Sequence, residues 1–186
     1  MIAQYIYKAL PYAIFFGIVY SIARIVYIKK KRVKIEIKEE IIKAVFWMYL
    51  FVLLSQTVFP LWQCGFCEGK FYLEVSTYGN GTINLIPFKT VYSYLTDNAA
   101  MSDWGEISKL NLLANLGLFL PLGFLFPLIY PKKAKYTVLV GGLLSLFIEI
   151  VQIFVERSSD VDDLLLNIIG TGIGYFIYKI IVKKQG

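Results

Sequence analysis

The chain has 186 residues, of which 58% are hydrophobic and 17% are charged, with a formal net charge of +6 and a mean hydropathy of +0.62. A soluble globular domain is less apolar and carries about a quarter charged residues, so that class is excluded. The basic residues form short clusters beside apolar runs, which is typical of membrane proteins and excludes a nucleic-acid-binding protein.

Five apolar segments approach the ~20 residues that a helix needs to cross a bilayer. They are residues 5–28, 41–62, 110–130, 136–155 and 164–182. The first is followed by a basic cluster and by no small-residue cleavage site, so we interpret it as a retained span and not as a signal peptide. The sequence therefore predicts an all-α transmembrane fold, a five-helix bundle.

The placement of charge predicts the orientation of this bundle. Lysine-rich clusters at residues 29–34, 132–135 and 179–184 follow the first, third and fifth spans, whereas most acidic residues stand in the other connections. Because cytoplasmic loops carry the excess of Lys and Arg, all three clusters face the cytoplasm if the N-terminus is outside. We predict a multi-pass protein of the cytoplasmic membrane, with the C-terminus inside.

These spans divide the chain into an N-terminal two-span region (1–62), an extracytoplasmic loop (63–109) and a C-terminal three-span part (110–186). Cys64 and Cys67 open the loop, and in an oxidising exterior a short disulfide is favoured over two incidental thiols. With two cysteines and no histidine in the chain, a structural zinc site lacks ligands, and no metal site is predicted.

The loop also predicts two small elements. Residues 71–85, FYLEVSTYGNGTINL, alternate in polarity around Gly79–Gly81, which predicts a small extracytoplasmic β-hairpin. Further on, Pro87 suits the first turn of a helix. The side chains of Phe88, Val91, Tyr92 and Leu95 then share one face. This predicts an amphipathic helix, which either lies in the outer headgroup layer as an interfacial helix or packs on the bundle.

Helical spacing places polar side chains on faces of three spans, near their predicted outer ends. Glu149, Gln152 and Glu156 share a face of the fourth span; Asp160, Asp163 and Asn167 share one at the turn into the fifth; Asn111 and Asn115 share one at the start of the third. Glu149 lies about 12 Å deeper along its helix than Arg157. A carboxylate at such depth costs on the order of 3 kcal/mol, so it needs a cavity or a partner, and the Arg157 guanidinium suits a carboxylate.

Two interpretations of these polar groups remain open. They form an interhelical hydrogen-bond network that fixes the bundle, or they form a polar cup, open to the outside, that binds the polar part of a ligand. We favour the cup, because three polar faces at one depth exceed what packing requires. Its predicted ligand-binding residues are Asn111, Asn115, Glu149, Gln152, Arg157, Asp160, Asp163 and Asn167.

An ordered set of motifs resembles one family. They are Asn-Leu-Ile-Pro-Phe at 84–88, Asn111-x3-Asn115 with FLPLGF at 119–124, Glu149-x2-Gln152, Arg157-x2-Asp160-x2-Asp163 and Asn167-x2-Gly170. Over residues 84–178 the chain resembles the VanZ-like membrane proteins. The resemblance implies a small bacterial multi-span protein whose namesake lowers susceptibility to the lipoglycopeptide teicoplanin without performing peptidoglycan-precursor chemistry.

Three functions follow from these observations. In the first, the protein binds membrane lipid and an amphiphilic ligand, either the lipoglycopeptide or a lipid-linked wall precursor. In the second, it is an intramembrane enzyme that acts on a lipid or lipid-linked substrate, in which Glu149 acts as base, Asp160 and Asp163 hold a divalent cation, and Arg157 binds phosphate. In the third it is a structural subunit of a membrane complex. We favour binding without a cofactor, because the chain has no histidine and no clear nucleophile–base pair. The small pair Gly170 and Gly174 permits close helix approach, including dimers.

Overall fold

The computed structural model describes residues 2–31, 36–58, 61–67, 70–76, 81–96 and 103–182. Its elements in chain order are α1 (Ile2–Lys31), α2 (Ile37–Thr57), β1 (Leu61–Cys67), β2 (Lys70–Ser76), β3 (Ile83–Asn84), α3 (Lys89–Thr96), α4 (Asp103–Ile129), η2 (Pro131–Tyr136), α5 (Thr137–Phe154), β4 (Ser159–Asp160) and α6 (Val161–Val182). The predicted all-α class with a small hairpin is confirmed, and each predicted span overlaps a helix.

Four of the described helical segments are long and apolar enough to cross a membrane by length and composition. They are Tyr12–Lys31, Leu112–Ile129, Pro131–Phe154 and Val161–Val182. The remaining predicted span, 41–62, overlaps α2, which is not among the four; its predicted end was wrong, because α2 stops at Thr57 and Leu61 and Trp62 stand in β1. Glu39, Glu40 and Lys43 stand in the first turns of α2 and Ser55-Gln56-Thr57 at its end, so its apolar stretch is shorter than that of its neighbours.

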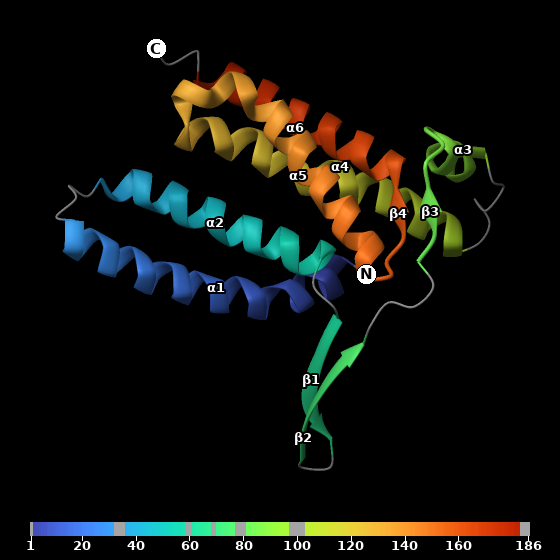
Figure 1. The fold of residues 1–186 in the computed structure, drawn as a ribbon, viewed down its shortest axis with the longest axis horizontal. Helices are drawn as coiled ribbons and strands as arrows, with labels where there is room; N and C mark the ends of the chain where they lie inside the picture. Colours follow the sequence, from blue (N-terminus) through green and yellow to red (C-terminus); the bar gives the residue numbers. More distant parts are fainter. Residues whose placement is uncertain are drawn as a thin grey trace.

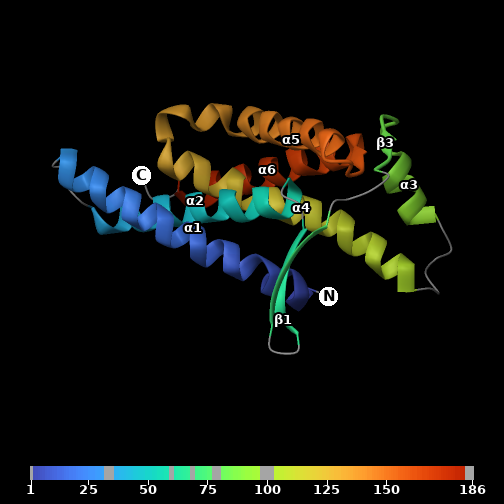
Figure 2. The ribbon, with the colours of Figure 1, turned by 60° about the horizontal axis from the view of Figure 1, so that its bottom comes forward.

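The helices form a bundle in which α4 is central. Figure 1 and Figure 2 show α4, α5 and α6 packed together, with the α1–α2 pair alongside, and α4 contacts α2, α5 and α6. We call the end that carries α3, β3 and the β1–β2 hairpin the hairpin end. The opposite end, with η2, the end of α1 and the start of α2, is the lysine end. The chain starts at the hairpin end and α6 finishes at the lysine end (Figure 1); which end faces the cytoplasm stays a prediction.

The hairpin is confirmed, but its turn is not the predicted one. β1 and β2 pair antiparallel with Cys67 opposite Lys70, so the hairpin joins these two strands and is not built around Gly79–Gly81. Residues 77–80 lie outside the described part. Ile83 and Asn84 were predicted to join this hairpin, and instead they pair in parallel with β4. The physical reason is the loop between α5 and α6, which offers these residues a pairing edge on the bundle.

Helices α1 and α2 are joined by an ion pair and a ring stack. The Arg24 guanidinium lies 2.6 Å from a Glu40 carboxylate oxygen, and that hydrogen bond holds the pKa of Glu40 at about 2. Phe16 stacks on Phe51 with ring centroids 4.2 Å apart. The exposed side chains of α1, among them Phe15 and Ile18, form an apolar surface suited to lipid.

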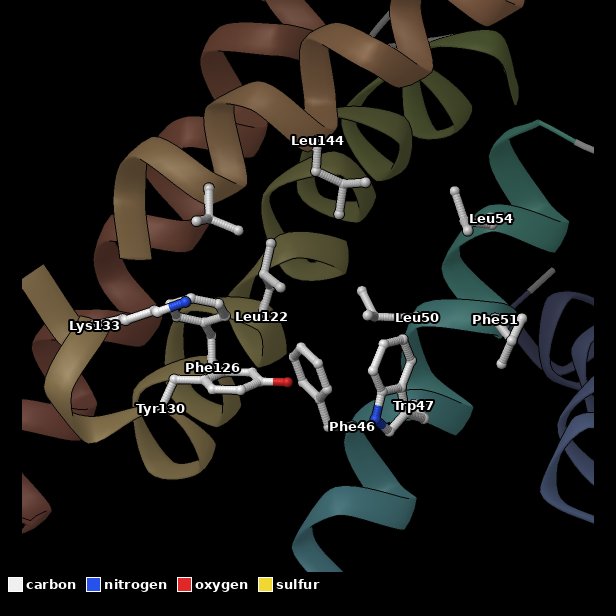
Figure 3. Close-up of a pocket in the computed structure, with 11 residues that line it drawn as sticks. Phe46, Trp47, Leu50, Phe51, Leu54, Leu122, Phe126, Tyr130, Lys133 and Leu144 are labelled. Atoms are coloured by element: carbon white, nitrogen blue, oxygen red, sulfur yellow. The ribbon is translucent and has the colours of Figure 1, made fainter. Parts of the chain in front are cut away.

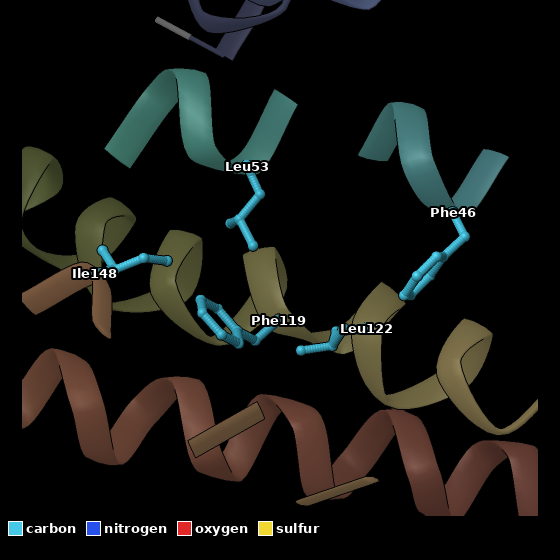
Figure 4. Packing of buried hydrophobic residues seen from close by; sticks show 5 residues of the cluster. All are labelled: Phe46, Leu53, Phe119, Leu122 and Ile148. Carbon is cyan, nitrogen blue, oxygen red and sulfur yellow. The ribbon is translucent and has the colours of Figure 1, made fainter. Parts of the chain in front are cut away.

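Helix α2 meets the other helices through a small core and leaves a groove beside it. The groove lies between α2, α4 and α5 in the half of the bundle nearer the lysine end (Figure 3). The core lies under it and holds five buried side chains (Figure 4): Phe46, Leu53, Phe119, Leu122 and Ile148. Tyr49 adds a hydrogen bond to the carbonyl of Leu118 at 2.6 Å. α4 is thereby held to α2 along much of its length.

Helices α4 and α6 approach through small residues. A Cβ added at Gly123 would stand 2.1 Å from the Thr171 carbonyl oxygen, and one added at Gly170 or Gly174 would stand equally close to a carbonyl oxygen of α4. No side chain fits there, so the two backbones pack directly, as small residues allow in membranes. Gly170 and Gly174 therefore have the predicted packing role, and the helices that they bring together belong to this one chain.

We expect Gly170→Ala to destabilise the protein and Gly172→Ala, its matched control two residues along α6, to leave it folded. The added Cβ at Gly170 meets backbone of α4, whereas the one at Gly172 meets nothing within 4 Å. Overpacking costs about 1–3 kcal/mol, whereas alanine in an open helical position gains up to ~1 kcal/mol. Thermal unfolding of detergent-solubilised protein checks this, and equal melting temperatures for the two variants would contradict the packing.

Candidate polar binding site at the hairpin end

The segment from Gly81 to Val91 docks on the loop between α5 and α6. β3 and β4 pair in parallel, with Ile83 opposite Ser159 and Asn84 opposite Asp160. The Gly81 amide donates to the Glu156 carbonyl at 3.1 Å, and the Ser159 amide donates to the Thr82 carbonyl at 2.9 Å. A Cβ on Gly81 would stand 2.3 Å from the Arg157 carbonyl oxygen, so only glycine permits this approach.

Asp162 holds the start of α3. Its Oδ1 accepts from the Phe88 amide at 2.5 Å, and its Oδ2 accepts from the amides of Thr90 and Val91 at 2.9 and 3.1 Å. The first amides of a helix have no partner within it and carry partial positive charge, so a carboxylate there is stabilising. The side chain is 1% exposed. Sequence reasoning missed this residue, because its partners stand more than 70 positions earlier in the chain.

Asp160 links three segments. Its Oδ1 accepts from the Asp162 amide at 2.9 Å, which is the N-cap arrangement at the start of α6, and from the Asn84 amide nitrogen at 3.1 Å. Its Oδ2 accepts a short hydrogen bond from the Thr90 hydroxyl. One expectation is corrected here: Asp160 precedes α6, which it caps, and does not share a helical face with Asp163 and Asn167.

Glu149 lies at the base of this network. It is 7% exposed, and its Oε2 accepts from the Ser159 hydroxyl at 2.8 Å and the Asp160 amide at 2.9 Å. Near it, the Asn115 amide donates a short hydrogen bond to Asp163. Two donors on one carboxylate oxygen offset much of the cost of burying it. The Asn111 side chain lies outside the described part, so its predicted role stays a prediction.

Arg157 and Gln152 meet the last turn of α2. The Arg157 Nη1 donates to the carbonyls of Gln56 and Thr57 at 2.9 and 3.0 Å, and the Gln152 Nε2 donates to the Thr57 carbonyl at 3.1 Å. The end of a helix leaves carbonyls unpaired and carries partial negative charge, so a guanidinium is favourable there. The structure thus gives Arg157 a capping role on α2, which the sequence did not predict.

The polar face predicted on the fourth span ends at Gln152. α5 stops at Phe154, and Glu156 takes a left-handed backbone conformation with φ 57° and an exposed side chain. The prediction that Glu156 continues the face of Glu149 was therefore wrong, because the chain turns sharply to reach β4.

Deeper in the bundle, Asn167 donates to the Ser145 hydroxyl at 2.9 Å. Among the described residues, two buried acceptor oxygens, Gln152 Oε1 and Asn167 Oδ1, have no hydrogen-bond donor. Within the same part of the chain, no group of three or more His, Cys, Asp and Glu side chains is placed to hold a metal ion. The structure thus brings seven of the eight predicted cup residues to the same half of the bundle, in several bonded groups.

A groove of about 270 Å³ lies beside these groups, where the network meets the surface. It is lined by Gly81, Ile83, Ile153, Glu156 and Arg157, so both charges and apolar side chains border it. Large apolar side chains are exposed nearby; we call this set the apolar rim, and it consists of Leu85, Ile86, Phe88, Tyr92 and Phe154. Leu85 is 76% exposed and Phe154 81% exposed. Exposed apolar side chains at the same end of the bundle as a charged groove suit contact with amphiphiles.

The sequence model of the VanZ/LLP1 family matches residues 46–182, which is most of the chain. The chain belongs to the VanZ/LLP1 family. No curated protein and no solved structure matches it. Every described cup residue lies within the matched range of this VanZ/LLP1 protein, as do α4, α5, α6 and both β pairs. Helix α1 precedes that range.

The predicted disulfide stays a prediction, because the side chains of Cys64 and Cys67 lie outside the described part. Both residues stand in β1. A regular strand separates the Cα atoms of residues three apart by about 10 Å, beyond the range of a disulfide. A bond between them would therefore require the end of β1 to bend.

We expect Asp162→Ala to release α3 from the bundle without unfolding it. Hydrogen bonds to a charged group are worth about 1.5–3 kcal/mol each, so amide exchange at Phe88, Thr90 and Val91 should rise about tenfold or more. The matched control is Glu156→Gln, which removes one charge at the same end but leaves the backbone contact to Gly81. Hydrogen-exchange mass spectrometry checks this, and equal protection of residues 84–96 in both variants would contradict the role of Asp162.

Proposed function

We propose that this VanZ/LLP1 protein lowers susceptibility to teicoplanin by binding an amphiphilic ligand at the hairpin end, either the lipoglycopeptide itself or a lipid-linked wall component. In this proposal the hairpin end faces the outside of the cytoplasmic membrane of a bacterium. Teicoplanin acts there and carries an acyl chain. The ligand's polar part lies in the cup and its chain lies along the apolar rim, which keeps the drug from its target.

The observation that carries this proposal is the groove beside Arg157 and Glu156. It places a cation and a carboxylate next to Ile83 and Ile153, so one ligand meets both chemistries within a few ångströms. Ligand sites are typically mostly apolar, with a few polar groups that fix orientation. The bonded groups behind it, from Glu149 to Asp162, fix the groove's backbone, and it is lined by Glu156 and by Arg157, whose guanidinium also binds the end of α2.

The apolar rim supports the same proposal. Leu85 and Phe88, from the segment between β3 and α3, and Phe154, from the end of α5, stand at the hairpin end, and each is more than half exposed. Side chains of this kind at the end of a membrane bundle insert into the boundary between headgroups and acyl chains. The rim therefore brings the groove to the depth at which an acylated ligand is anchored.

Catalysis is less well supported. In the enzyme hypothesis, Asp160 holds a cation, yet both its oxygens accept hydrogen bonds from Asn84, Thr90 and the α6 backbone. Glu149, the base of that hypothesis, accepts two hydrogen bonds on one oxygen. Carboxylates with such contacts anchor the backbone and neighbouring side chains. The hypothesis that the protein is a structural subunit stays a prediction.

The test is the susceptibility of a teicoplanin-sensitive Gram-positive host that expresses the protein. We expect the wild type to protect against teicoplanin but not against vancomycin, which lacks the acyl chain. Arg157→Gln and Ile153→Ser should each lower protection about tenfold, the scale of one lost contact to a charged group or of one lost side-chain contact. The matched control Glu39→Gln, at the lysine end, should protect fully at equal membrane levels.

Ile153→Ser keeps the test informative if Arg157→Gln fails to accumulate, because the Ile153 side chain is 42% exposed. Protection against neither drug by the wild type would overturn the resistance proposal. If both groove variants still protect the host at normal membrane levels of the protein, the ligand does not bind in this groove.

A further inference from the structure

The apolar groove between α2, α4 and α5 lies away from the candidate site, nearer the lysine end. Its volume is about 540 Å³, within the usual range for ligand pockets of ~300–1,000 Å³. From Phe46 to Leu54 along α2 it extends over eight residues, about 12 Å. Its walls are almost wholly aliphatic and aromatic, so it suits a hydrocarbon chain.

One charge stands at the mouth of this groove. Figure 3 shows Lys133, from η2, among the lining side chains on the same side of the groove as Tyr130, whose hydroxyl is directed toward Phe46 of α2. No acidic residue lines the groove. In the described part of the chain, no ion pair involves Lys133, whereas Glu39 and Glu40 in the first turn of α2 are paired with Arg24 and Lys43.

We infer that this groove is a binding site for an anionic phospholipid. One acyl chain lies between α2 and α4, along Leu50, Leu54 and Leu122, and the phosphate meets the Lys133 ammonium and the Tyr130 hydroxyl. A lysine near the membrane surface attracts anionic lipid, and the aromatic residues Trp47 and Tyr130 are of the type enriched at the interface. The site is distinct from the amphiphile site proposed at the hairpin end and does not depend on it.

The choice of an anionic lipid rests on charge complementarity. A zwitterionic headgroup would bring a cation of its own against Lys133. A second copy of the chain would have to present to the groove a helix that is apolar and also carries an acidic residue. The exposed faces of α1 and α5 instead carry aliphatic and aromatic side chains such as Ile18, Leu139 and Phe147.

The experiment uses Trp47 as the reporter, because it lines the groove. The chain has three tryptophans, so Trp62→Phe and Trp104→Phe leave Trp47 as the one source of indole fluorescence. The protein is reconstituted in phosphatidylcholine vesicles containing a minor fraction of phosphatidylglycerol or phosphatidylcholine with brominated acyl chains. Bromine quenches Trp47 when its chain occupies the groove.

We expect brominated phosphatidylglycerol to quench Trp47 with about fivefold higher apparent affinity than brominated phosphatidylcholine, the factor given by one lysine beside an anionic lipid. Lys133→Gln should remove this preference. The matched control is Lys132→Gln, a neighbour with the same charge that does not line the groove, and it should keep the preference.

Three results would overturn the inference. Equal quenching by both lipids in the wild type would mean that only bulk lipid reaches Trp47. Equal loss of preference in Lys132→Gln and Lys133→Gln would mean diffuse attraction and no site. Quenching that disappears as the protein-to-lipid ratio rises would mean that a second copy covers the groove. Normal protection against teicoplanin in Lys133→Gln would show that the two sites are independent.

Discussion

The hairpin end depends on carboxylates that are buried and bonded to backbone amides. Asp162 satisfies three amides at the start of α3, Asp160 caps α6, and Glu149 accepts from the backbone amide of Asp160. In a membrane such amides have few other partners, and each unsatisfied group costs several kcal/mol. The acidic residues that made the sequence unusual for a membrane protein are thus what allows irregular backbone to exist at this end.

Their bonding also changes how the polar residues are interpreted. The two interpretations drawn from the sequence, a structural network and a ligand cup, were treated as alternatives. The structure supports the network directly for Asp160, Asp163 and Asn167, each of which has a partner within the chain. A cup is compatible with this network, because the bonded carboxylates hold the loop that carries Arg157 to the border of the groove.

Much of the fold could be predicted from the sequence, because apolar length and lysine placement directly reflect the bilayer. The predicted spans differ from α4, α5 and α6 by a few residues at most of their ends. The predictions that were wrong concern contacts between segments that are far apart in the chain. The hairpin turn was placed at the strongest local turn signal, Gly79–Gly81, although Ile83 finds its partner in Ser159. Asp162 was passed over because an acid in the first turn of a helix needs no further explanation locally.

The proposed amphiphile site and the proposed lipid groove differ in the interactions that hold their ligands. The first combines charges held at helix ends with exposed apolar side chains, and the second is an apolar space with one lysine at its mouth. α2 borders both, since Arg157 meets its last turn and Phe46 and Leu50 line the groove. A change in the tilt of α2 would alter both sites together.

The parallel pairing of β3 with β4 has a consequence for biosynthesis. Its partners are 76 positions apart, and α4 and α5 lie between them. Because a chain is made from its N-terminus, residues 81–91 leave the ribosome well before the segment that binds them. Closing so long a loop is slow compared with forming a helix. The hairpin end is therefore completed only after residues 159–162 have been made, and a chain stalled before Asp160 would carry the helices up to α5 but no candidate site.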